Sequence, residues 1–71
     1  MSNINLKILQ LALREGKPAI VVYQGKKGIT QRRVYVRSIT EERVTVYCTQ
    51  KKGIRVFQAD GILAARIADE G

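Results

Sequence analysis

Apolar residues in the first part of the chain recur at helical spacing, and this pattern predicts one helix. Within Ser2–Glu15, one stripe is formed by residues three or four positions apart, namely Ile4, Ile8, Leu11 and Ala12. Gly16 stands where a left-handed C-cap residue is favoured and Pro18 follows, so the helix is expected to end at Glu15. Further leucines widen the apolar surface, namely Leu6, Leu9 and Leu13. They indicate either a broad face on the protein's own core or a surface for a partner chain.

The remainder of the chain shows the two-residue period of β-strands. Short apolar or alternating runs predict five strands, over Ala19–Gln24, Ile29–Ile39, Arg43–Gln50, Ile54–Gln58 and Leu63–Ala68. Turn residues separate them at Gly25–Gly28, Thr40–Glu42 and Lys51–Gly53, and a single helical turn is expected at Asp60-Gly61. Gly53 is the residue expected to take a positive φ in its turn.

One helix followed by five short strands is typical of a small, strongly bent barrel of the SH3-like or Sm-like type. Closure of the barrel is favoured because an open sheet of this size leaves unpaired edges. The chain is therefore predicted to be mainly β and to form one domain over 1–71, with the helix over 3–15 and the barrel over 18–68. The predicted core comprises Ile20, Val22, Val34, Val36, Val44, Val46, Ile62, Leu63 and Ile67, together with either Val56 or Phe57.

The composition limits how such a small domain can be stabilised and where it can work. Cys48 is the only cysteine, so a disulfide within the chain is excluded, and a free thiol suits a reducing cytosol. The absence of histidine argues against a zinc site of the usual type, and no metal or cofactor is expected. The sequence shows no secretory signal and no apolar run near the ~20 residues of a membrane span, so a soluble, cytoplasmic protein is expected.

Positive charge is concentrated in the middle of the chain. The formal net charge is +7, and residues 17–58 hold ten lysines and arginines against Glu41 and Glu42, a local balance of +8. Such a balance favours a polyanion such as nucleic acid, or a phosphate-bearing ligand. The same charge also serves solubility, since small soluble domains commonly carry net charges of about 2–8.

The residue types that support catalysis are poorly represented. There is no histidine to activate the Cys48 thiol, and Glu41 and Glu42 point to opposite sides of an extended chain. Gly25 and Gly28 precede a strand, whereas a phosphate-cradling glycine loop precedes a helix. The chain is therefore expected not to be an enzyme.

The strongest candidate binding surface lies on one face of the long predicted strand. Val34 and Val36 share a face with Arg32, which leaves Arg33, Tyr35 and Arg37 together on the other, with Tyr47 expected on the neighbouring strand. Arginines pair with phosphates and aromatic rings stack on bases, so this face suits nucleic acid or a nucleotide. Ordinary cross-strand pairing explains the same residues without a ligand.

Two lysine pairs stand at predicted hairpin turns, Lys26-Lys27 and Lys51-Lys52. They belong to a short internal repeat, since each pair is followed by Gly-Ile. The pairs offer two basic prongs to phosphates, and they equally serve turn formation and the protection of sheet edges.

The order of several motifs resembles a WYL domain, in a minimal stand-alone form. The resemblance covers about residues 18–68 and rests on Tyr23, Arg33-Val34-Tyr35, Arg55-x-Phe57 and the break Asp60-Gly61-Ile62, whereas Val44-Thr45-Val46 replaces the name-giving triplet. It implies an SH3- or Sm-like barrel, found in bacterial regulators or phage-linked proteins, that senses nucleotide or nucleic-acid ligands through a basic surface. The matched ligand positions are Arg33 and Arg55.

A second resemblance is to the bacterial Sm-like RNA chaperone. It rests on the passage from Leu11-Ala12-Leu13-Arg14 through Pro18 to Ile20, whereas Phe57-Gln58-Ala59 replaces the motif characteristic of that family. It implies a ring of identical subunits. The alternative function is therefore a protein-interaction or self-assembly module that uses the N-terminal helix, as a homo-oligomer or with a partner protein.

Overall fold

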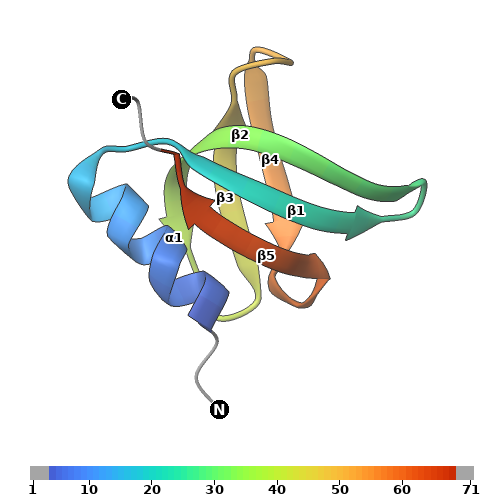
Figure 1. The fold of residues 1–71 in the computed structure, drawn as a ribbon, viewed down its shortest axis with the longest axis horizontal. Helices are drawn as coiled ribbons and strands as arrows, with labels where there is room; N and C mark the ends of the chain where they lie inside the picture. Colours follow the sequence, from blue (N-terminus) through green and yellow to red (C-terminus); the bar gives the residue numbers. More distant parts are fainter. Residues whose placement is uncertain (1–3, 69–71) are drawn as a thin grey trace.

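The structure is a computed structural model, and it describes residues 4–68. The chain runs through α1 (Ile4–Glu15), β1 (Ala19–Gly25), β2 (Gly28–Ile39), β3 (Arg43–Cys48), β4 (Gly53–Gln58), the 3₁₀ turn η1 (Ala59–Gly61) and β5 (Ile62–Ile67) (Figure 1). The predicted mainly-β fold, with one helix and five strands, is confirmed. The helix start expected at residue 3 lies outside the described residues.

The end of α1 follows the local signals of the sequence. Gly16 has a φ of +68°, and its N–H and that of Lys17 donate to the carbonyls of Leu13 and Ala12, at 3.2 and 3.0 Å. These bonds satisfy carbonyl groups that the helix itself leaves unpaired. The chain then turns at Pro18, whose carbonyl accepts a 2.9 Å bond from the Ala68 N–H. This bond ties the end of β5 to the start of β1.

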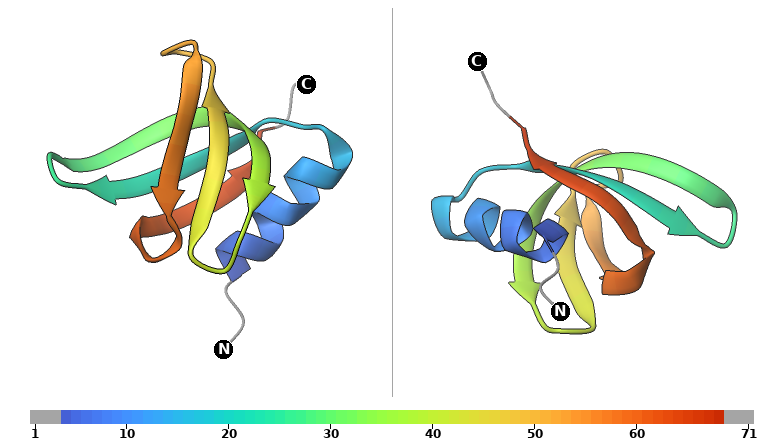
Figure 2. Two further views of the ribbon diagram at one scale, coloured as in Figure 1. Left: turned by 180° about the vertical axis from the view of Figure 1, so that it is seen from behind. Right: turned by 60° about the horizontal axis from the view of Figure 1, so that its bottom comes forward.

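The five strands form one antiparallel sheet in the order β4-β3-β2-β1-β5. Its strands curve around a common inner side, and α1 packs against β5 and β2 at one end of that side (Figures 1 and 2). β4 and β5 are the two edges of this order. The hydrogen-bonding pattern of the described residues therefore does not show the predicted closure of the barrel.

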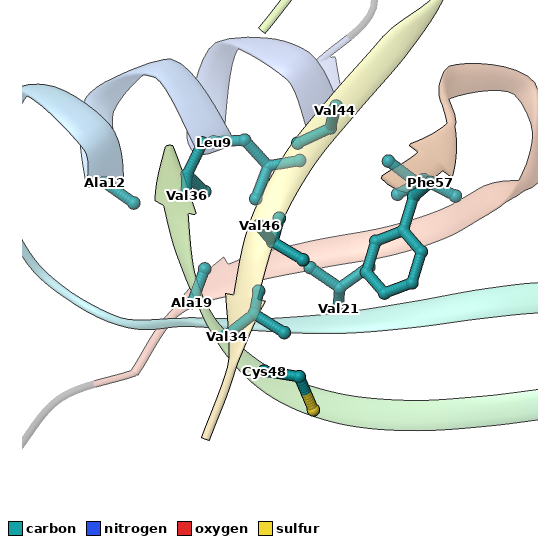
Figure 3. Packing of buried hydrophobic residues seen from close by; sticks show 11 residues of the cluster. Leu9, Ala12, Ala19, Val21, Val34, Val36, Val44, Val46, Cys48 and Phe57 are labelled. Carbon is teal, nitrogen blue, oxygen red and sulfur yellow. The ribbon is translucent and has the colours of Figure 1, made fainter. Parts of the chain in front are cut away.

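The inner face of the sheet carries the hydrophobic core (Figure 3). The alternation predicted for β2 and β3 is confirmed, since Val34, Val36, Val44 and Val46 are buried. Cys48 continues this row and is fully buried. Leu9 and Ala12 of α1 complete the core from the helix side, with Leu6 packed against it. Of the three additional leucines, Leu6 and Leu9 contact the core and Leu13 is exposed. Of the predicted stripe, Ala12 is buried, Ile8 and Leu11 are half-buried, and Ile4 is 66% exposed.

The predicted phase of β1 is wrong. Ala19 and Val21 are buried in the core, whereas Ile20 and Val22 lie on the outer face. Ala19 pairs with Val34 across the sheet, and this register fixes which alternate set points inward. Both alternate sets of β1 are apolar, so the local pattern could not decide between them.

The predicted core near β4 and β5 is partly confirmed. Phe57 is buried and Val56 is exposed, which resolves the two alternatives left open by the sequence. Ile62 is buried and Ile67 packs against the core, but Leu63 is 46% exposed. The register between β1 and β5 shifts after Val22, and this irregularity removes Leu63 from the inward set.

An aromatic pair joins β1 to β4 across the curved sheet. The rings of Tyr23 and Phe57 stack with centroids 4.6 Å apart, and the Tyr23 hydroxyl accepts a 3.4 Å bond from the Gln58 N–H. Gly61 lies directly against the Tyr23 ring, where a Cβ would come within 2.7 Å of Cε1. A side chain is excluded at this position by its contact with the ring.

Replacing Gly61 with alanine is expected to lower the unfolding free energy by about 1–3 kcal/mol, as overpacking commonly does. The new Cβ would also lie 3.2 Å from the Gln24 carbonyl oxygen, a backbone atom that cannot rotate away as a side chain can. Urea titration followed by circular dichroism measures the change. Gly53→Ala is the matched control, because a Cβ there meets only the Lys51 carbonyl, at 3.9 Å. Equal stability of the two variants would contradict the expectation.

Candidate nucleic-acid interface

The predicted binding residues divide between the two faces of the sheet. Tyr35 pairs with Tyr47, and Tyr47 pairs with Ile54, so these three side chains share the outer face, with Arg33 two residues from Tyr35. Arg55 pairs with Val46 and therefore lies on the inner face. The structure brings Arg33, Tyr35 and Tyr47 together and separates them from Arg55.

The outer face is a shallow arrangement of rings and arginines. Tyr35 is 40% exposed and Tyr47 is half-buried beside it. Arg37 falls in a β-bulge where the register shifts between Val36 and Ser38, so β2 twists locally at this residue. The Arg33 carbonyl accepts a 3.3 Å bond from the Thr49 hydroxyl, and this bond helps to hold β2 to the end of β3.

The inner face opens into a hollow of about 250 Å³ between the β1–β2 hairpin and β4. Four basic residues line it, Lys26, Lys27, Arg32 and Arg55, with Tyr23, Thr30 and Phe57 among the other lining residues. Arg55, Lys26 and Lys27 are thus brought together as candidate ligand residues. We call this site the basic hollow.

Arg32 was not among the residues predicted to bind a ligand. It pairs with Val21 across the sheet and is half-buried on the inner face. The sequence held a signal for it, since alternation placed Arg32 on the same face as Val34 and Val36. A charged residue that continues a core-facing row lies where the core meets solvent, at the rim of the curved sheet.

The two inner arginines influence the ionisation of the buried Cys48 thiol. Burial acts to raise the pKa of the Cys48 thiol, but backbone hydrogen bonds from Lys51 and Gln50 and the charges of Arg32 and Arg55 outweigh it, so the pKa is lowered. Across residues 4–68, neither arginine forms an ion pair with a carboxylate. Their positive charge is therefore available to an anionic ligand.

The carboxylates lie away from the basic hollow. Glu41, Glu42 and Asp60, together with Arg43, line a second hollow of about 480 Å³ at the β2–β3 turn and η1. Glu15 lies at the end of α1 and pairs with Lys17 at 3.4 Å. The described part of the molecule therefore has a basic region and a separate acidic region.

The second lysine pair is not part of the basic hollow. Lys51 and Lys52 occupy the β3–β4 turn, which projects from the sheet at a different place from the β1–β2 turn (Figure 1). Lys52 takes a φ of +53°, so the expectation that Gly53 would carry the positive φ is wrong. Gly53 instead begins β4, opposite Cys48.

The described residues do not form a recognisable metal-binding cluster. Residues 4–68 contain no group of three or more histidine, cysteine, aspartate or glutamate side chains that could hold one. No helix in this part of the chain is long and apolar enough to cross a membrane.

Comparison with known proteins gives a similarity of fold. No protein-family model and no curated protein matches the sequence. Among solved structures, the proteasome accessory factor B/C (PafBC) of Arthrobacter aurescens is similar, with a TM-score of 0.76 and 22% sequence identity. The match covers 93% of this chain but only 11% of that chain. A small part of PafBC therefore has the same helix-and-five-strand fold.

Proposed function

We propose that this protein is a non-catalytic binding module that takes a phosphate group of a nucleic acid or nucleotide into the basic hollow. The observation that carries the proposal is that Arg32 and Arg55 line the same hollow and form no ion pair with a carboxylate of residues 4–68. Lys26 and Lys27 add charge at the rim of the same hollow. Guanidinium groups without a carboxylate partner bind phosphate through short, charge-assisted hydrogen bonds.

The shape of the basic hollow supports a phosphate group rather than a stacked base as its occupant. The Tyr23 and Phe57 rings that line it already stack on each other, and Tyr23 is held between this contact and Gly61. Bases of a bound strand would instead find ring surface at Tyr35 and Tyr47 on the outer face, beside Arg33. The proposed interface is thus a phosphate site with a separate stacking surface.

The proposal extends to the kind of protein that uses this module. The order of motifs resembles a WYL domain, and the fold is similar to that of a segment in the much larger PafBC. Both observations support a regulatory module that reports a bound nucleotide or nucleic acid to a larger assembly. The absence of a paired nucleophile and base in the sequence supports a role in binding without catalysis.

Fluorescence anisotropy with a labelled single-stranded oligonucleotide tests the proposal. Binding is expected at low salt, and the association constant is expected to fall with salt at a slope of about −0.7 for each phosphate contacted. With Arg32, Arg55 and one rim lysine engaged, the slope should be about −2. Absence of binding to RNA, DNA and free nucleotides at low salt would overturn the proposal.

A further inference from the structure

The outer edge of β4 is an unpaired row of backbone groups. The bond from the Ala59 N–H to the Glu42 carbonyl, at 2.8 Å, fixes the phase of the β3–β4 ladder. In this register, the backbone N–H and C=O groups of Gly53, Arg55 and Phe57 point toward β3. Those of Ile54, Val56 and Gln58 point away from it. The Gln58 N–H accordingly donates to the Tyr23 hydroxyl. The backbone groups of Ile54 and Val56 have no partner among the described residues.

The side chains around this edge differ on its two sides. Ile54 and Val56 lie on the outer face and are 55% and 56% exposed, next to Tyr47 and Thr45 of β3. Arg55 lies on the inner face and borders the basic hollow. The edge therefore combines free backbone groups with apolar side chains outside and positive charge inside.

We propose that an extended acidic segment of a partner protein binds this edge as an additional strand. A strand beside β4 would take hydrogen bonds from Ile54 and Val56, as in other cases of strand addition to a sheet edge. Its residue opposite Arg55 would point into the basic hollow, where a carboxylate meets Arg55, Arg32 and the rim lysines. Its neighbours would lie on the outer face against Ile54 and Val56. The segment that fits thus alternates acidic and apolar residues.

A second copy of this chain fits the edge less well. The antiparallel register that pairs Ile54 of one copy with Val56 of the other sets the two Arg55 side chains opposite each other, and like charges at such positions are destabilising. A shift of two residues in one direction requires the Gln58 N–H, which already donates to Tyr23. In the other direction, Val56 meets Lys52, which lies before β4 in the turn and has a φ of +53°. An inward-pointing charge on an edge strand is a known protection against self-pairing. The charge of Arg55 therefore favours an acidic strand over a copy of β4.

The experiment uses the full chain and a labelled seven-residue peptide in which glutamate alternates with valine. A peptide of the same composition, with its glutamates and valines in two blocks, is the matched control for charge alone. The alternating peptide is expected to bind at least about tenfold more tightly in fluorescence anisotropy, because only it places its charges on one side of the strand. Amide hydrogen exchange is expected to slow at Ile54 and Val56 when it is bound.

Two variants at one position isolate the backbone contribution. Val56→Pro removes the outward N–H, and proline is tolerated on strand edges. Val56→Ala keeps this N–H and loses most of the same exposed side chain. Val56→Pro is expected to weaken peptide binding about tenfold relative to Val56→Ala, because a carbonyl of the bound peptide then lacks the N–H donor at position 56. Because Val56 also borders the basic hollow, oligonucleotide affinity is compared between the same two variants. It is expected to be equal in Val56→Pro and Val56→Ala, which separates this proposal from the proposed function.

Should Val56→Pro fail to fold, hydrogen exchange of the unmodified chain and the double variant Ile54→Thr/Val56→Thr decide the question. The double variant keeps two β-branched residues and is expected to lose peptide affinity without loss of structure. Three results would overturn the proposal. The first is equal binding of the two peptides. The second is amide exchange at Ile54 and Val56 that does not change when the alternating peptide is added. The third is slowed exchange at these residues when oligonucleotide is added or the protein concentration is raised, without peptide.

Discussion

Replacing Phe57 with alanine is expected to cost about 3–5 kcal/mol of unfolding free energy, as truncation of a buried aromatic residue commonly does. Phe57 is only 6% exposed and stacks on Tyr23, so the substitution removes core volume and the ring contact that joins β4 to β1. A chain of 71 residues has a total stability of about 4–10 kcal/mol. The variant should therefore be largely unfolded at moderate urea concentrations that leave the parent folded.

Val56→Ala is the control for the Phe57 substitution. Val56 is the preceding residue in the same strand but points outward and is exposed, so its truncation should change the unfolding free energy by no more than about 0.5 kcal/mol. Urea titration by circular dichroism measures both variants. A larger loss for Val56→Ala than for Phe57→Ala would contradict the burial of Phe57.

The double variant Arg32→Gln/Arg55→Gln is expected to weaken oligonucleotide binding about 100-fold at low salt, if each arginine contributes one charge-assisted hydrogen bond of about 1.5 kcal/mol. Both residues line the basic hollow and lack an ion-pair partner across residues 4–68. The slope of log K against log salt should become less negative by about 1.4, because two phosphate contacts are lost. Anisotropy titrations at several salt concentrations measure both quantities.

A matched double variant outside the basic hollow distinguishes a site from a general charge effect. Arg37→Gln/Arg66→Gln removes the same charge from two exposed residues, and Arg66 pairs with Ile20 outside the basic hollow. It is expected to weaken binding less than about tenfold, through the general field of the molecule alone. Equal losses in the two double variants would contradict a specific site in the hollow. A larger loss in Arg37→Gln/Arg66→Gln would place the interface outside the basic hollow.

The candidate site was only partly predictable, because its residues are joined by cross-strand contacts. Arg55, Lys26 and Lys27 were identified from charge and motif, but they were grouped with Arg33 and Tyr35, which the register places on the opposite face. Arg32 was assigned to the correct face and yet was not recognised as a candidate. Arg32 becomes a candidate only because Arg55, 23 positions away in the sequence, lines the same hollow.

The sequence by itself determined the elements that depend on neighbouring residues. The helix stop at Gly16, the strand alternation around Val34 and Val36, and the basic balance of the central segment all follow from local chemistry and spacing. Tertiary structure decided the rest, including the inward phase of β1, the choice of Phe57 over Val56 and the exposure of Leu63. In each of these cases both alternatives are apolar, so hydrophobicity could not separate them. Only the cross-strand register, which is a contact between distant segments, selects one.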